Sequence, residues 1–299
     1  MNNKSINDKI LQYPVLNEAI SALALKNLSE RTVTNYLDGI ARFLDFIEYD
    51  NSFDITIEHF KQYLVYLNSL PLKKNSVNNY NSHIRFFFNA VLYKTVNPYI
   101  VPMAKADVKK IDFLTDSQIR SLLSVTYKDS RFDCIVKLAL CCGLRINEVV
   151  SIKICDIHTK DSSKYIFIRE SKRNKSRFVP MDNTVYRAIQ RYAKEYNIIP
   201  GTENYFFRFS KQSHHTCNET IRRYFNIYKS AAGIQDSLTF HSLRHSFAVN
   251  FLKAGGNVMD LKYRLGHGSL MSTSRYLHFT KNMMNTNISY LDTLLKGGI

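Results

Sequence analysis

The pattern that most restricts the fold of this chain lies in residues 241–278. His241 and Arg244 are three residues apart, so a helix places both side chains on one face. The other side of this helix is apolar and can be buried; it consists of Leu243, Phe247, Ala248, Phe251 and Leu252. The glycine pair 255–256 ends the helix. We therefore expect a helix that turns two polar side chains toward a common site.

A second helix is predicted directly after the glycine pair. Asn257 can cap it, and its apolar positions continue to Gly266. His267 follows at the turn, where an imidazole can point into a cleft, and a short segment leads to Tyr276. A tyrosine oxygen beside cationic and hydrogen-bonding groups is a set suited to attack on a phosphodiester.

This order of residues resembles the active-site half of the tyrosine recombinases, the phage-integrase and Xer-like enzymes. That family has His-x-Leu-Arg-His, then Leu-Gly-His, then a tyrosine nine residues further, and this chain contains all three pieces at that spacing. The resemblance implies that Tyr276 is the nucleophile and that Arg244 stabilises the charge on the phosphate. It also implies that His241 helps the tyrosine to lose its proton and that His267 hydrogen-bonds a nonbridging oxygen.

His245 lies one helical turn after His241, which is also a spacing used by two-histidine metal sites. The glutamate of the zinc-protease motif is missing between them, so we expect no metal and no cofactor here. We assign His245 a supporting role.

A second match precedes this region by about 100 residues. Gly143-Leu144-Arg145 with Glu148 is similar to the first arginine box of the family, Gly-Leu-Arg-x-x-Glu. Arg145 is expected to offer a guanidinium fork to two phosphate oxygens. Glu148, three residues later, is expected to support that fork.

A β-hairpin is predicted between these two regions, with one strand over residues 165–169 and another over 177–180. Isoleucines at 152, 154 and 157 indicate a strand before it. The family has a Gly-Lys-Gly turn here, and Lys172 matches its catalytic lysine, although Ser171 and Arg173 replace the glycines. We also expect DNA contacts from the basic residues of the hairpin: Arg173, Lys175 and Arg177.

The first 96 residues show the apolar period of a small all-α domain. We expect residues 1–14 to be loose, a first helix over 15–26, and three more helices that begin after Ser29, after Thr56 and at Asn75 or Ser76. This layout resembles the SAM-like core-binding domain of the recombinases.

Two turns of this domain carry basic and hydroxyl residues near helix N-termini, an arrangement that binds phosphates. Ordinary helix capping is the other interpretation, and both can hold at once. The residues are Lys26, Ser29, Arg31, Thr32, Lys73, Lys74 and Asn75.

The predicted organisation is residues 1–96, a linker over 97–112, and a mixed α/β catalytic domain over 113–299. Prolines interrupt the linker, and its Lys105 is a candidate DNA contact. Arg222 and Arg223 are further candidates, with plain surface exposure as the alternative. The fold class is therefore mainly α with a small antiparallel sheet.

The net charge of +16 favours a polyanionic partner, and nucleic acid is the usual one. Residues 111–299 hold 28 of the 41 basic residues and 15 of the 25 acidic ones, so the excess is concentrated there. The five cysteines contain no Cys-x-x-Cys pair, which indicates a reducing cytoplasm. We expect neither a membrane span nor a signal peptide.

The resemblance implies a site-specific recombinase that cleaves and rejoins double-stranded DNA through a 3′-phosphotyrosyl link. It also implies four protomers on two DNA sites, and we expect the amphipathic tail over residues 282–296 to dock on a neighbouring protomer. A type IB topoisomerase, a DNA-binding regulator without activity and a metal phosphodiesterase are the rival interpretations. The outcome of recombination, whether integration, excision, inversion or resolution, does not follow from the sequence.

Overall fold

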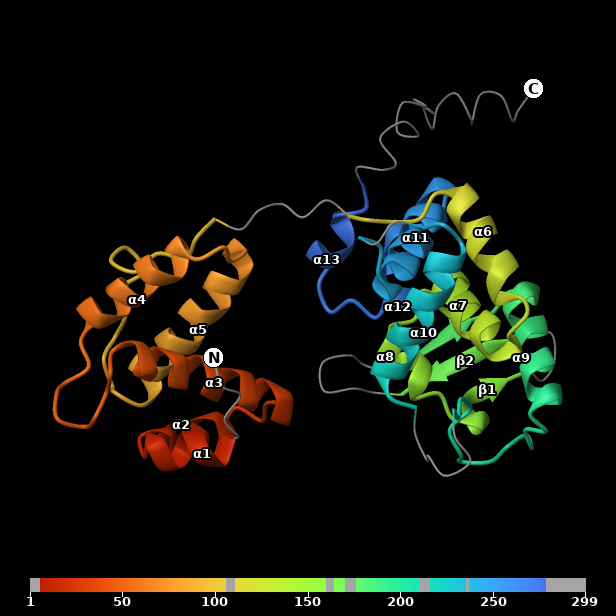
Figure 1. The fold of residues 1–299 in the computed structure, drawn as a ribbon. Helices are drawn as coiled ribbons and strands as arrows, with labels where there is room; N and C mark the ends of the chain where they lie inside the picture. Colours follow the sequence, from red (N-terminus) through yellow and green to blue (C-terminus); the bar gives the residue numbers. More distant parts are fainter. Residues whose placement is uncertain are drawn as a thin grey trace, which may run out of the picture. The chain divides into compact units, whose positions relative to one another are not determined.

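The computed structural model describes residues 6–105, 111–159, 164–169, 176–209, 216–234 and 237–277. The chain divides into two compact units, residues 1–109 and 110–299 (Figure 1). Each unit has its own apolar core. The predicted fold class is confirmed, because helices dominate and the strands form one small antiparallel sheet.

The first unit is built from helices. They are α1 (Ile6–Gln12), α2 (Leu16–Ala24), α3 (Glu30–Phe46), α4 (Ile57–Ser69) and α5 (Lys74–Ala90). Helix α1 lies in the stretch that we expected to be loose. Lys9 pairs with Asp38, and the hydroxyl of the buried Tyr13 donates to Asp45, so long-range contacts with α3 order this segment.

The helix starts of this unit follow the predicted caps closely. The Ser29 hydroxyl accepts a hydrogen bond from the backbone N–H of Thr32, and Thr56 forms a capping box with His59. Helix α5 begins at Lys74, one residue before the predicted start, and its N-cap Lys73 makes no side-chain capping bond.

Part of the predicted linker packs on the first unit. Val101 is buried in its core, and the side chains of Asn78 and Asn81 donate to the carbonyls of Ala104 and Pro102. Hydrogen bonding with helix α5 therefore extends this unit beyond residue 96.

The second unit surrounds helix α7. Its helices are α6 (Asp116–Thr126), α7 (Ser130–Cys142), α8 (Ile146–Val150), α9 (Asn183–Glu195), α10 (Asn218–Ala231), α11 (Phe240–Lys253), α12 (Val258–Leu265) and α13 (Met271–Ser274). Helix α7 packs against α6, α8, α9 and α11 (Figure 1). Its fully buried side chains explain its apolar sequence; they include Phe132, Ile135 and Leu138.

The sheet contains β1 (Ile157–His158), β2 (Tyr165–Ile168) and β3 (Arg177–Pro180) in the order β1-β2-β3. Both pairs are antiparallel, and Ile168 lies opposite Arg177. The strand expected over residues 152–157 is reduced to β1, preceded by the short 3-10 helix Ile154–Asp156. The N–H groups of Ile154 and Cys155 donate to the 202–204 loop instead of to a strand ladder.

None of the helices in the described part of the chain combines the length and the apolar character needed to cross a bilayer.

Candidate active site

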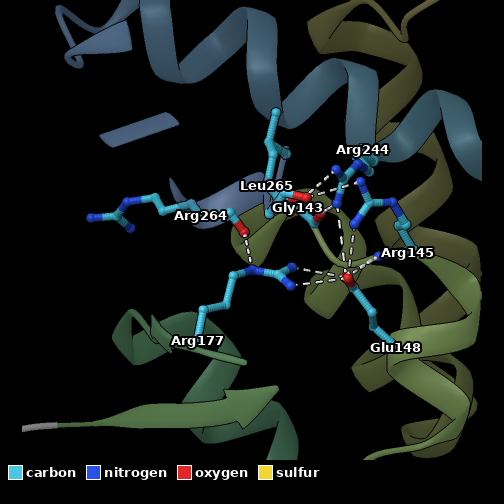
Figure 2. A network of polar contacts seen from close by, with 8 residues as sticks. Gly143, Arg145, Glu148, Arg177, Arg244, Arg264 and Leu265 are labelled. Carbon is cyan, nitrogen blue, oxygen red and sulfur yellow. Dashed lines mark hydrogen bonds and ion pairs between the residues drawn. The ribbon is translucent and has the colours of Figure 1, made fainter. Parts of the chain in front are cut away.

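Glu148, in helix α8, is the centre of a buried arginine cluster (Figure 2). Arg145 is the N-cap of that helix, and its backbone N–H donates to Glu148 Oε2 at 2.9 Å. The Arg145 Nη1 donates to Oε1 of the same carboxylate, also at 2.9 Å. Glu148 therefore fixes both ends of Arg145, as the arginine box led us to expect.

Arg177 of strand β3 reaches the same carboxylate from the opposite side (Figure 2). Its Nη1 and Nη2 donate to Glu148 at 3.0 and 2.9 Å, and its Nε donates to the Arg264 carbonyl at 2.8 Å. Arg177 is only 3% exposed. The prediction that it contacts DNA is therefore wrong, because its guanidinium is enclosed and bonded inside the unit.

Arg244 of helix α11 is the third arginine, and its residue is 1% exposed. Its Nη1 and Nη2 donate to the carbonyls of Gly143 and Leu265, both at 2.6 Å. Gly143 ends helix α7 with a φ of 66°, a left-handed conformation that favours glycine. This turn leaves the Gly143 carbonyl free of the helix ladder and available to the guanidinium.

The cluster carries more positive than negative charge. Burial by itself raises the pKa of Glu148, but hydrogen bonds and charge from Arg177, together with the charge of Arg244, bring it below the ordinary value. Burial, with the neighbouring charge of Arg145, lowers the pKa of Arg244 to about 9. At neutral pH one carboxylate thus faces three guanidinium groups, which favours an anion such as a phosphate.

His267 follows helix α12, whose C-cap Gly266 has a φ of 60°. The His267 Nδ1 lies 2.9 Å from Thr273 Oγ1, so helix α13 fixes the imidazole. Burial and the nearby charges of Arg244 and Arg145 lower the pKa of His267 to about 3. The ring is therefore neutral at physiological pH and suited to donate one hydrogen bond.

Tyr276 lies in the interior, at 2% exposure. Its hydroxyl is 2.7 Å from Nδ1 of His245, in helix α11. Burial raises the pKa of Tyr276, although the charges of Arg244, Arg275 and Arg145 act in the opposite direction. The predicted nucleophile is thus in the electrostatic field of both predicted phosphate-binding arginines.

His241 is one turn before His245, and the two rings meet edge to face with centroids 4.5 Å apart. His245, rather than His241, contacts the Tyr276 hydroxyl. No local pattern indicates this contact, because it joins residues 31 positions apart. Arg275 is a further cation near the site that is absent from the predicted set, although it directly precedes the tyrosine.

The other predicted residues of this unit either lie outside the described part of the chain or lie on its surface. Lys172, Arg173 and Lys175 lie outside the described residues, as does the predicted tail over 282–296. Arg222 is exposed and pairs with Glu219 at 2.9 Å, and Arg223 is exposed as well. Within residues 6–105, 111–159, 164–169, 176–209, 216–234 and 237–277, no three His, Cys, Asp or Glu side chains are grouped to hold a metal ion.

Most candidate DNA contacts of the first unit are exposed. Lys26, Arg31, Lys73, Lys74 and Asn75 lie at or near helix ends, and Lys105 lies in the irregular segment after α5. Ser29 and Thr32 are partly covered, and their two hydroxyls hydrogen-bond each other at 2.6 Å. Capping and phosphate contact thus remain compatible at this turn.

Comparison with known proteins shows the family of this chain. Residues 112–283 match the phage integrase family, and residues 15–97 match the phage integrase N-terminal SAM-like domain. A tyrosine recombinase of Pseudothermotoga lettingae is 30% identical over 85% of this chain and 89% of its own length. Tyrosine recombinase XerC of Staphylococcus haemolyticus is 26% identical over 87% and 90%.

Two solved structures share the fold. XerH recombinase bound to a palindromic difH substrate, a post-cleavage complex, has a TM-score of 0.72 and 20% identity, covering 96% of this chain and 89% of that one. A lambda integrase dimer bound to a COC′ core site has a TM-score of 0.69 and 19% identity, covering 88% and 94%. The chain belongs to the phage integrase family of tyrosine recombinases.

Proposed function

We propose that this chain is a site-specific DNA recombinase that cleaves and rejoins DNA strands through a 3′-phosphotyrosyl intermediate. The observation that supports this best is the placement of Arg145 and Arg244 around one buried carboxylate, with the phenol of Tyr276 in their field. The cations provide a phosphate site, and the phenol provides the nucleophile.

In the proposed reaction the Tyr276 oxygen attacks the phosphorus and the bond to the 5′ oxygen breaks. The extra negative charge of the pentavalent state is stabilised by the Arg145 and Arg244 guanidinium groups, which are already oriented by their hydrogen bonds. The leaving oxygen takes a proton, for which Lys172 is the proposed donor. Attack by a 5′ hydroxyl on the phosphotyrosine reverses these steps, so joining requires no nucleotide cofactor.

The two remaining histidines are proposed to act on the phosphate and the nucleophile. His267 is neutral and held by Thr273, so it can donate a hydrogen bond to a nonbridging oxygen. His241, whose ring contacts that of His245, is proposed to assist the loss of the tyrosine proton in the reacting position.

The first unit is proposed to bind DNA with the exposed helix ends of α3 and α5. A polar cleft of about 440 Å³ lies between these helices and is lined by side chains that include Thr32, Asn35, Ser76 and Asn79. It adjoins both predicted phosphate-binding turns, through Thr32 and Ser76. Amide and hydroxyl groups beside lysines suit a DNA surface.

DNA-bound relatives support a double-stranded DNA partner, since XerH was solved with its difH substrate and lambda integrase with a COC′ core site. Assembly as a tetramer on two sites, with the tail docked on a neighbouring protomer, is part of this proposal. A topoisomerase and a regulator without activity are less favoured, because the relatives are named recombinases and the arginines and the tyrosine are all present.

The test begins with the Tyr276→Phe variant, which is expected to bind DNA without cleaving it. This variant selects its sites from a random pool of duplexes. The parent chain is then mixed with a selected duplex that carries a 5′-bridging phosphorothiolate, which traps the adduct because the sulfur leaving group does not rejoin. We expect a protein–DNA adduct that survives denaturation and EDTA.

The matched control is Tyr127→Phe, which alters an exposed tyrosine of the same unit. Tyr127→Phe should form the adduct, and Tyr276→Phe should not. An adduct in Tyr276→Phe refutes the assignment of the nucleophile. Failure of the parent chain to form any adduct on DNA that it binds favours the regulator without activity.

A further inference from the structure

We propose that His245 is a positioning residue that holds the Tyr276 hydroxyl in a stored, buried position. The proposal rests on the proposed function, because it concerns the nucleophile of that reaction. It assigns to one imidazole the control of whether the phenol is available, a role separate from those of His241 and His267.

The first step is the environment of the phenol. Tyr276 packs in an apolar cluster with Phe247, Ala248, Val249, Leu252, Leu261 and Leu265. Its hydroxyl brings a polar group into this cluster, and a buried hydroxyl needs a hydrogen-bonding partner. Nδ1 of His245 supplies that partner at 2.7 Å.

The second step is access. A nucleophile must come within about 3–3.5 Å of the atom that it attacks. A charged DNA strand does not enter an apolar cluster, and Tyr276 is only 2% exposed. The tyrosine must therefore leave its position before it reacts, and the bond to His245 must break as it does so.

The third step concerns the proton. The groups that act on His245 are His241, Arg244 and Arg275, and together with burial they lower its pKa to about 4. The pKa of Tyr276 is raised above its ordinary value of 10. Transfer of the proton from the phenol to this imidazole is therefore disfavoured, because the imidazole is the weaker base. In this arrangement the contact keeps Tyr276 protonated instead of activating it.

Because Nδ1 of His245 makes the contact, two substitutions can test it separately from the rest of the ring. Asparagine carries a polar atom on Cγ, as histidine carries Nδ1, so His245→Asn preserves a partner for the hydroxyl. Glutamine places its polar atoms one bond further, at the reach of Nε2, so His245→Gln does not. His245→Leu removes the hydrogen bond and keeps an apolar side chain.

The test measures the exposure of Tyr276 in the full chain without DNA. Tetranitromethane nitrates accessible tyrosines, and trypsin releases Tyr276 in the peptide 276–281, where it is the only tyrosine. Tyr99, which is 95% exposed, lies alone in the tryptic peptide 95–105 and serves as the internal reference. Circular dichroism confirms that each variant is folded.

We expect the nitration rate of Tyr276 to rise about tenfold in His245→Leu and His245→Gln, the factor that corresponds to one lost hydrogen bond to a buried group. His245→Asn should stay near the parent rate. Equal rates in all four proteins overturn the proposal, and so does an equal rise in His245→Asn and His245→Leu, which would assign the effect to ring packing. If His245→Leu is unfolded, the comparison of His245→Asn with His245→Gln decides in the same way.

No DNA is present in this experiment, so its result is independent of strand cleavage. A chain that forms no adduct but shows the expected nitration pattern would refute the recombinase proposal and leave the contact established. A chain that forms the adduct but nitrates equally in every variant would do the reverse.

Discussion

Arg177 and Glu148 form a buried two-bond ion pair that joins strand β3 to helix α8. The two Nη atoms of Arg177 lie 3.0 and 2.9 Å from the two carboxylate oxygens, and the side chains are 2% and 10% exposed. Glu148 in turn holds Arg145. Arg177 therefore helps to orient Arg145 through Glu148, and its own guanidinium is too buried to contact DNA.

Replacing Arg177 with methionine should destabilise the second unit by about 3–5 kcal/mol, because it leaves Glu148 short of a partner in the interior. Arg177→Lys should recover only part of this loss, because an ammonium cannot make the parallel pair of bonds. Chemical unfolding of the full chain measures both values.

The control for this prediction is Arg222→Met. Arg222 pairs with Glu219 on the surface, with the two side chains 51% and 79% exposed, so the change should cost less than about 1 kcal/mol. Similar losses for Arg177→Met and Arg222→Met would contradict the structural role of Arg177.

Replacing Arg145 or Arg244 with lysine should slow adduct formation by roughly 10²- to 10³-fold, the range found when one preorganised donor to a developing charge is removed. DNA binding should change much less, because both variants keep the positive charge. Initial adduct rates and binding isotherms on the same duplex separate the two effects. Arg191→Lys, on helix α9, is the control and should keep the parent rate.

Local spacing predicts which side chains share one face of a helix, but it does not predict their distant partners. The motif around Arg244 and the box around Arg145 contain pairs three or four residues apart, which a helix places on one face. Arg177 lies in a basic hairpin sequence, which favours the wrong prediction of a DNA contact. Its burial depends on Glu148 and Arg264, which are 29 and 87 residues away.

Contacts between residues distant in sequence also explain where the fold differs from the prediction. The first helix does not follow from its polar sequence, because contacts of Lys9 and Tyr13 with helix α3 stabilise it. The isoleucines before β1 have the alternation of a strand, but their backbone pairs with the 202–204 loop. The length of the first unit depends on Val101, whose burial no local pattern indicates.

The first unit should contribute to DNA binding through Lys73 and Lys74. The logarithm of the affinity should fall linearly as the logarithm of salt concentration rises, because phosphate contacts release counterions. Lys73→Gln with Lys74→Gln should reduce that slope by about two, at roughly 0.9 for each phosphate contact. Lys61→Gln, whose lysine pairs with Glu58, should leave the slope unchanged. An unchanged slope in the double variant would remove this turn from the DNA interface.

The half-buried imidazoles of His267 and His245 should make the chain less stable in mild acid. His267 and His245 have pKa values of about 3 and 4 in the folded chain, below the value near 6.5 of the unfolded chain. Between about pH 4 and pH 6.5 the unfolded state therefore binds more protons than the folded state. The free energy of unfolding should fall as the pH is lowered through this range. His267→Asn removes one titrating ring and keeps an atom that can contact Thr273. Its unfolding temperature should fall less than that of the parent between pH 7 and pH 5; an equal fall would exclude His267 as a cause.

Gly266 is required both for its positive φ and for the space beside Arg177. Gly233 shares only the first property, so it serves as the control. Both glycines have a positive φ, 60° and 65°, so alanine costs about 1–2 kcal/mol of backbone strain at either position. A Cβ at Gly233 meets no atom within 4 Å, whereas a Cβ at Gly266 lies 2.7 Å from Nη1 of Arg177. Gly266→Ala must therefore also displace the guanidinium that holds Glu148. We expect Gly233→Ala to lose only the strain energy and to keep the adduct rate. Gly266→Ala should lose more stability than Gly233→Ala and should slow adduct formation. If both variants give the same unfolding free energy and the same adduct rate, the Arg177 contact does not matter.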